Sequence, residues 1–217
     1  MRCYVRAMNY LACTLAILIG CGNDGGHGTV DAPKTIDATM ITGAIVGTWN
    51  RDPNQDQTIG FASITFHSDG TVAEMDPNMA TKTGTYSLPS AGRVLLTPTP
   101  GMGSGSNSGP IETDYVATTN NLVLTAFLPQ GTVNGFVGTW RNMTITNGAT
   151  QTIDMAVAAN NTATFTTTTS QGSVPITGTW AAAPVGFTFT APSYTLSLKF
   201  VPIGANQAIG YLAFVKA

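Results

Sequence analysis

An internal repeat constrains the fold of this chain more than any other feature of its sequence. Three blocks recur in the same order, 91 or 94 residues further on: Val46–Trp49 as Val137–Trp140, Thr83–Tyr86 as Thr177–Trp180, and Gly92–Thr99 as Gly186–Ser193. Matched blocks in one order indicate a duplication, in which each copy is a structural unit of the same kind. The chain must therefore build one architecture twice.

Apolar side chains within the copies recur at every second residue, which is the period of a β-strand with one buried face. Ile153, Met155 and Val157 show this period in one segment, and Phe187 and Phe189 show it in another. Residues that tolerate turn backbone separate such segments: Ser68–Gly70, Pro89–Gly92, Asn120–Asn121, Asn160–Asn161 and Gly204–Asn206. The sequence therefore predicts an all-β fold of antiparallel strands, about seven in each copy.

The motifs of the first copy occur in an order known from one family. A Gly-x-Trp at Gly47–Trp49 is followed by Phe66–Thr71 (FHSDGT), then by Gly84–Tyr86 and a leucine-rich segment. This order resembles that of small bacterial lipocalin-like domains, which are meandering β-barrels. The resemblance is weaker in the second copy, where Ala159–Thr162 replaces the Ser-Asp-Gly-Thr turn.

The lipocalin-like resemblance implies two tandem antiparallel meander β-barrel modules, residues 43–128 and 129–217. One larger merged barrel or sandwich built from both copies is the alternative. Four large aromatic residues stand at matched places in the two copies: Trp49, Tyr86, Trp140 and Trp180. We expect them to pack against the ends of the barrels, with contact to a ligand as the alternative role. Short strands with Phe, Tyr, Leu and Met pointing inward favour a filled interior over a ligand cavity.

The N-terminal residues have the layout of an export signal. Arg2 and Arg6 precede an apolar run, Tyr10–Ile19, whose length of about ten residues is half of the roughly 20 that a membrane-spanning helix needs. The run ends in Leu18-Ile19-Gly20-Cys21, which resembles the lipobox of bacterial lipoproteins. That resemblance implies a signal peptide of residues 1–20, cleavage before Cys21, and acyl chains attached to Cys21.

A lipidated Cys21 implies a protein anchored to a membrane of the cell envelope, because two or three acyl chains hold firmly where one holds only reversibly. Residue 22 is Gly, where lipoproteins retained at the inner membrane of enterobacteria carry Asp, and this favours the outer membrane. Residues 21–42 mix Gly, Asp, Thr and Pro without a sustained period. We expect them to form a flexible tether.

Composition argues against several classes of function. Charged residues make up 9% of the chain, against about 25% in typical soluble domains, and nine Lys and Arg stand against eleven Asp and Glu. No basic patch is expected, and with it no nucleic-acid partner. The other two cysteines, Cys3 and Cys13, lie in the predicted signal peptide. We therefore expect no disulfide and no thiolate metal site in the mature protein.

Residues that could bind a metal or carry catalysis are few. His67 is the only histidine of the predicted body, and the second copy holds a single acid, Asp154. The segment Asp52–Asp56 (DPNQD) opens like a calcium loop, but Gln57 and Ser63 occupy the places where an EF-hand has Gly and Glu. A looser calcium site there is the alternative to a solvated loop. We expect no enzyme, no metal and no cofactor.

Two arginines of the first copy, Arg51 and Arg93, are expected to pair with Asp residues on neighbouring strands, contributing at most about 1 kcal/mol each if exposed. The whole pattern predicts a lipid-anchored envelope protein whose duplicated body is a non-enzymatic binding or interaction module. Its partners would be the membrane, through Cys21, and a protein or other envelope component. A carrier of a small apolar ligand in a lipocalin-like cavity is the alternative, and an enzyme is the least favoured class.

Overall fold

A computed structural model describes residues 45–54, 61–76, 80–99, 109–184, 186–203 and 206–217. These residues form fourteen β-strands and no helix, so the predicted all-β fold is confirmed. Neighbouring strands run antiparallel throughout. The predicted signal peptide, Cys21 and the tether lie outside the described residues.

Each copy contributes seven strands. The first copy holds β1 (Gly47–Arg51), β2 (Ser63–Phe66), β3 (Thr71–Met75), β4 (Thr81–Ser90), β5 (Arg93–Pro98), β6 (Ile111–Ala117) and β7 (Asn121–Pro129). The second holds β8 (Gly138–Thr146), β9 (Ala149–Val157), β10 (Thr162–Thr169), β11 (Gly172–Ala183), β12 (Gly186–Ala191), β13 (Tyr194–Ile203) and β14 (Asn206–Lys216). The number of strands agrees with the repeat.

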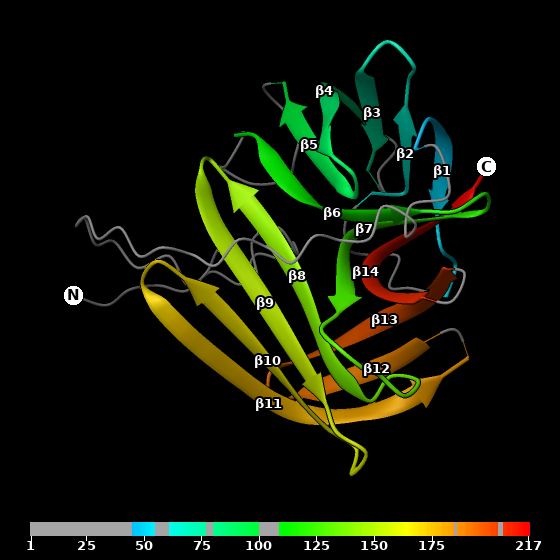
Figure 1. Ribbon diagram of the computed structural model, residues 1–217. Coiled ribbons are helices and arrows are strands. Elements are labelled where there is room, and N and C mark those ends of the chain that lie inside the picture. Colours follow the sequence, from blue (N-terminus) through cyan, green and yellow to red (C-terminus); the bar gives the residue numbers. More distant parts are fainter. Residues whose placement is uncertain (1–44, 55–60, 77–79, 100–108, 185, 204–205) are drawn as a thin grey trace.

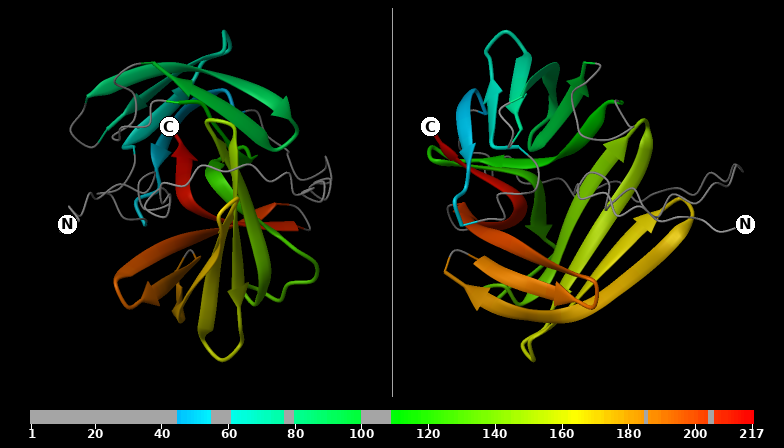
Figure 2. Two further views of the ribbon diagram at one scale, coloured as in Figure 1. Left: turned by 90° about the vertical axis from the view of Figure 1, so that its left-hand side faces the viewer. Right: turned by 180° about the vertical axis from the view of Figure 1, so that it is seen from behind.

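The strands close into one ring, in which strands consecutive in sequence are neighbours and β14 returns to β1. A further pairing, between β7 and β14, crosses the ring and divides it into two circuits. One circuit consists of β1 to β7 with β14, and the other of β8 to β13 with β7 and β14. Figure 1 and Figure 2 show these circuits as a first lobe and a second lobe, with β7 and β14 between them.

The last strand of each copy pairs with the first strand of the other copy and not with the first strand of its own. β14 pairs with β1, placing Lys216 opposite Trp49, and β7 pairs with β8, placing Pro129 opposite Trp140. Among the described residues, no pairing joins β1 to β7 or β8 to β14. The pairings therefore do not confirm two self-contained barrels, because each copy closes its circuit with the last strand of the other.

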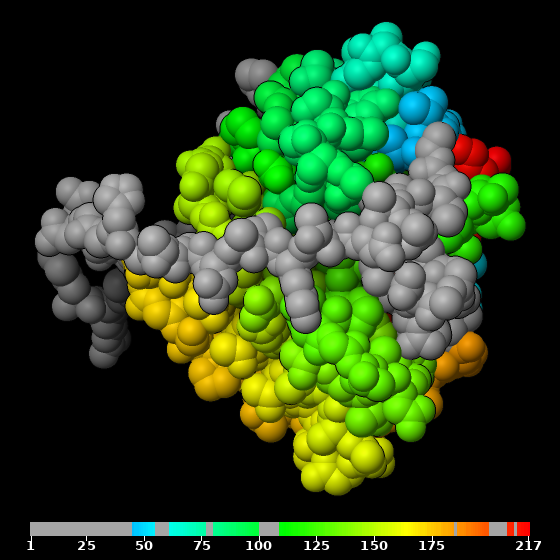
Figure 3. All heavy atoms as spheres, viewed as in Figure 1, coloured from blue at the N-terminus to red at the C-terminus, as the bar shows by residue number. Residues whose placement is uncertain are grey.

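Each lobe has its own hydrophobic core, and each core includes one phenylalanine from the other copy. The first core contains Trp49 and Phe66 of the first copy together with Phe214 of β14. The second contains Trp140 and Met155 of the second copy together with Phe127 of β7. A smaller cluster from β6, β7 and β14 lies between them. In the space-filling view the first copy forms the upper part of the visible face and the second copy the lower part (Figure 3).

The turn between β9 and β10 repeats the turn between β2 and β3, although the two sequences differ. Thr71 donates its backbone N–H and its hydroxyl to Asp69 at 2.9 and 2.6 Å. Thr162 donates the same two groups to Asn160 at 3.2 and 2.7 Å. Asn161 stands where the first copy has Gly70, with φ of 63° and 84° respectively. Because Asn tolerates the left-handed region better than most residues, the second copy keeps the turn without the glycine.

Candidate functional site

Two of the four predicted aromatic site residues, Trp49 and Trp140, lie inside the cores. Trp49 is 1% exposed and Trp140 is fully buried. The indole Nε1 of Trp49 donates to the carbonyl of Ile45 at 2.7 Å, and that of Trp140 donates to the carbonyl of Phe136 at 3.0 Å. Each tryptophan thus ties the first strand of its copy to the residue four positions earlier, and the indole N–H of each is used within the fold.

The other two aromatic residues, Tyr86 and Trp180, hold the equivalent turns just described. The hydroxyl of Tyr86 donates to the carbonyl of His67 at 2.8 Å, and Nε1 of Trp180 donates to the carbonyl of Ala158 at 2.9 Å. Tyr86 also packs edge-on against Phe66, with ring centroids 5.0 Å apart. All four aromatic residues are half-buried or buried, and each donates its polar hydrogen to a backbone carbonyl.

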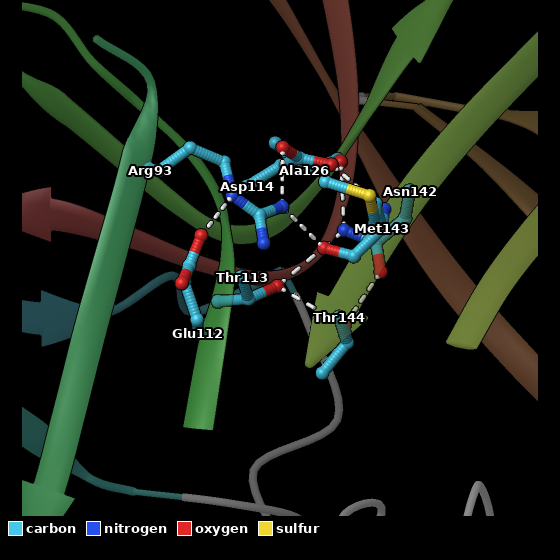
Figure 4. A network of polar contacts seen from close by, with 8 residues as sticks. All are labelled: Arg93, Glu112, Thr113, Asp114, Ala126, Asn142, Met143 and Thr144. Atoms are coloured by element: carbon cyan, nitrogen blue, oxygen red, sulfur yellow. Dashed lines mark hydrogen bonds and ion pairs between the residues drawn. The ribbon is translucent and has the colours of Figure 1, made fainter. Parts of the chain in front are cut away.

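The structure brings together a buried polar cluster that joins the two copies (Figure 4). Arg93 of β5 donates to Asp114 at 2.8 Å and to Glu112 at 2.9 Å, both on β6. Its Nη1 also donates to the carbonyl of Met143 on β8 at 2.6 Å, and the N–H of Met143 donates to Asp114 at 2.7 Å. Arg93 and Asp114 are each 5% exposed. The predicted pairing of Arg93 with an Asp on a neighbouring strand is confirmed, but the pair is buried instead of exposed.

Uncharged side chains extend this cluster along β8. Asn142 donates to the carbonyl of Ala126 on β7 at 3.0 Å, and Thr144 donates to the amide oxygen of Asn142 at 3.0 Å. The hydroxyls of Thr113 and Thr144 lie 3.3 Å apart across the β6–β8 pairing. Together with Arg93, Asp114 and Glu112, these residues form what we call the junction cluster. Arg93 Nη2 is the one nitrogen of that guanidinium with no hydrogen-bond partner among the described residues.

A second buried ion pair joins the copies at the equivalent place on the other side. Lys199 of β13 donates to the carboxylate of Asp52, which directly follows β1, and to the side-chain oxygen of Asn121 on β7 at 2.8 Å. Asp52 comes three residues after Trp49, as Met143 comes three residues after Trp140. Both junctions thus hold a buried charge at matched places, supplied by the first copy in one and by both copies in the other.

Burial and hydrogen bonding shift the pKa of the two buried aspartates in opposite directions. Burial raises the pKa of Asp114 above its ordinary value, although Arg93 and the Met143 N–H act against it. Burial also acts to raise the pKa of Asp52, but hydrogen bonds from Lys199 and Asn54 outweigh it and hold this pKa below its ordinary value. Asp52 is therefore an ionised partner of Lys199. Asp56, the other acid of the calcium-loop sequence, lies outside the described residues.

A small surface pocket of about 200 Å³ adjoins Lys199. Asn54 of the first copy lines it together with residues of the second: Ala183, Pro184, Gly186, Thr188, Ser197, Leu198 and Lys199. None of the four predicted aromatic residues lines this pocket. Its walls combine the side chains of Asn54, Thr188, Ser197 and Lys199 with aliphatic groups.

Metal-ligating side chains do not gather within the described ranges. No group of three or more His, Asp, Glu or Cys residues lies close enough there to hold a metal ion. His67 is exposed, and its backbone serves the turn held by Tyr86. Asp154 pairs with Arg141 through two hydrogen bonds of 2.6 and 2.9 Å on the outer face. A search of the described residues for a helix with the length and hydropathy of a membrane span finds none.

Comparisons with known proteins add no identification. The chain matches no protein-family model, no curated protein and no solved structure. The functional interpretation therefore depends on the residues themselves.

Sequence reasoning did not find the charged residues at the two junctions as a set. Lys199 occurs in the polar half of the alternation Tyr194–Val201, so its period indicates a solvent-facing side chain. Asp114 stands in Ile111–Ala117, whose last five residues are all buried. The signal available in the sequence is in β7, where Leu122–Leu124 and Ala126–Leu128 are apolar without alternation. Such a run indicates a strand buried on both faces, next to a second layer.

Proposed function

We propose that this chain is a bacterial lipoprotein, anchored through an acylated Cys21 to the cell envelope, in which the duplicated β-body is a non-enzymatic binding module. The observation that carries the proposal is Leu18-Ile19-Gly20-Cys21 at the end of a short apolar run. A cysteine at that boundary has a clear chemical role as an acylation site. The Gly at position 22 supports placement at the outer membrane.

The described body supports a binding role through its outer surface. On β10, Ala163 and Phe165 face the core, so Thr162, Thr164, Thr166 and Thr168 face outward. Thr164 is 3.0 Å from Thr177 of β11, and Thr168 is 2.8 Å from Ser173. Neither β10 nor β11 carries a charged residue. Such a surface offers hydroxyls without strong electrostatic fields, which suits an uncharged partner such as another protein or an envelope polymer.

We propose further that each lobe is a lipocalin-like barrel module, and that the last strand of the other copy in the same chain closes its ring of strands. The meander order and the tryptophan that opens each copy support this assignment.

Fatty-acid labelling of the full chain in a bacterial host tests the anchor. Wild type should incorporate an alkyne-tagged fatty acid and fractionate with membranes, and Cys21→Ser should do neither. Cys13→Ser is the matched control, because it removes a cysteine of the predicted signal peptide and leaves Cys21 in place. Labelling of Cys21→Ser at the wild-type level would remove the lipoprotein assignment.

A photo-crosslinking side chain tests the binding surface. Placed at the exposed Thr177 of the anchored protein, it should yield discrete adducts with an envelope component. Placed at the exposed Ser90, on the first lobe, it should yield few. If neither site gives adducts in growing cells, the outer face of β10 and β11 is not a binding surface.

A further inference from the structure

The last strand of the chain, β14, is a wall of both lobes. Along one edge it pairs with β13 through Lys199–Ile203 and with β1 through Trp49–Arg51, and along the other edge it pairs with β7. Without β14, three other strands would each lose a neighbour, and both circuits would open. An open circuit leaves unpaired N–H and C=O groups at strand edges, which water or another chain must then satisfy.

The side chains of the terminal strands cross between lobes in the same way as their backbones. Phe214 is buried in the core of the first lobe, and Phe127 is buried in the core of the second. The two phenylalanines are equivalent, since each lies two residues before the residue that faces the lobe's opening tryptophan. A fully buried phenylalanine contributes a large apolar area, so each core lacks a central part until the other copy is in place.

Lys216 fastens the end of β14 to the first lobe. Its Nζ lies 4.1 Å from the centroid of the Trp49 ring and donates to the carbonyl of Val46 at 3.0 Å. The backbone N–H of Ala217 donates to the carbonyl of Thr48 at 3.0 Å. Residues at the end of the second copy thus complete the first strand of the first copy.

The buried charges follow the same plan. Arg93 and Asp114 of the first copy are satisfied in part by the backbone of Met143 in the second. Lys199 of the second copy is satisfied by Asp52 and Asn121 of the first. Without the first copy, Lys199 would lose its carboxylate partner, and a buried charge that loses its partner is strongly unfavourable. Without the second copy, Arg93 and Asp114 would keep each other but would lose their hydrogen bonds to the backbone of Met143.

We infer that the duplication does not produce two autonomous domains, but an obligate pair in which each copy completes the other with its last strand. The described body folds and unfolds as one cooperative unit, and the first lobe closes only when β14 is in place. This inference concerns the β-body and does not depend on lipidation of Cys21.

Fluorine NMR of the full chain labelled with 5-fluorotryptophan tests the inference, because Trp49 reports on the first lobe and Trp140 and Trp180 on the second. In urea, the three native signals should disappear with one midpoint. Phe214→Ala, in the second copy's sequence, should lower the midpoint of Trp49 as much as that of Trp140. Phe127→Ala should likewise lower all three. Val174→Ala, at an exposed position of β11, is the control and should move none.

Two outcomes would overturn the inference. One is a Trp49 midpoint separate from that of Trp140 and Trp180 in the wild type. The other is a Phe214→Ala variant that shifts Trp140 and Trp180 and leaves Trp49 unchanged. If Phe214→Ala does not fold, Phe214→Leu is the milder variant, and the same comparison of midpoints applies.

Cleavage between the copies gives a second, independent measurement. A protease site inserted beside Gly131 or Gly135, which are exposed in the connection between β7 and β8, should be cut without loss of the native signals. The two fragments should then elute together in size-exclusion chromatography and separate only in denaturant. Fragments that elute as two folded monomers would contradict the obligate pair.

Discussion

The guanidinium of Arg93 and the carboxylate of Asp114 lie 2.8 Å apart, and both also bind the backbone of Met143 in the other copy. Removing one partner of a buried pair leaves an uncompensated charge, at a typical cost of about 3–5 kcal/mol. We expect Arg93→Met to lower the free energy of unfolding by an amount in that range, measured by urea denaturation.

Arg141 provides the matched control for Arg93. Its ion pair with Asp154 is bidentate but exposed, with 48% of the Arg141 side chain accessible. Exposed pairs contribute about 0–1 kcal/mol, so Arg141→Met should change stability little. Equal losses in the two arginine variants would mean that breaking the buried Arg93 pair costs no more than breaking the exposed Arg141 pair.

Acid should weaken the second junction. The pKa of Asp52 is lower in the folded protein than its ordinary value of 3.8. Ionised Asp52 therefore contributes stability that is fully present above pH 3.8 and is lost as the pH falls through the lowered folded value. We expect Asp52→Asn to lower the urea midpoint at pH 7 and to flatten its decline below pH 4. A variant with the wild-type decline would show that Asp52 is not responsible for it.

The two equivalent turns predict a nearly neutral substitution. Asn160 accepts from Thr162 the same two hydrogen bonds that Asp69 accepts from Thr71. Asp69→Asn should therefore keep the turn and leave the urea midpoint at pH 7 nearly unchanged, as for most surface substitutions. Asp69→Ala, which has no acceptor, is the comparison and should have a lower urea midpoint than either. Equal effects of Asn and Ala would show that these hydrogen bonds do not stabilise the turn.

Much of this fold could be predicted because the signals are local. The period of two, the turn residues and the repeated blocks are enough to predict the strand class, the approximate strand number and the turn at Asn160. The pairing of terminal strands could not be predicted, because an apolar strand such as β7, buried on both faces, is compatible with closure on β1 or on β8. The burial of Lys199 could not be predicted for the same reason, since it depends on a segment distant in sequence that includes Asp52.

Thr125 has a strained backbone at the middle of β7. Its φ is 56°, in the left-handed region, which a β-branched residue adopts at a cost of about 1–2 kcal/mol. It lies where β7 exchanges β6 for β8 as its neighbour. We expect Thr125→Asn to raise the unfolding free energy by up to about 1 kcal/mol, because Asn tolerates this region. Thr164→Asn, in the regular strand β10, should lower it instead. If Thr125→Asn lowers the free energy of unfolding as much as Thr164→Asn does, the backbone at Thr125 is not strained.

The seam between β7 and β14 should tolerate no added volume at Gly210. A Cβ at this position would collide with Cγ1 of Val123 on β7, which is fully buried. Overpacking of this kind costs about 1–3 kcal/mol, so Gly210→Ala should lower the free energy of unfolding by that amount. Val123→Ala removes the colliding methyl groups and leaves a small void of its own. If the steric conflict is the cause, the double variant should be more stable than the sum of the two single losses predicts, with a coupling of about 0.5–3 kcal/mol in a double-mutant cycle. Strictly additive losses would mean that Gly210 is required for backbone reasons and not for close contact between the two strands that both lobes share.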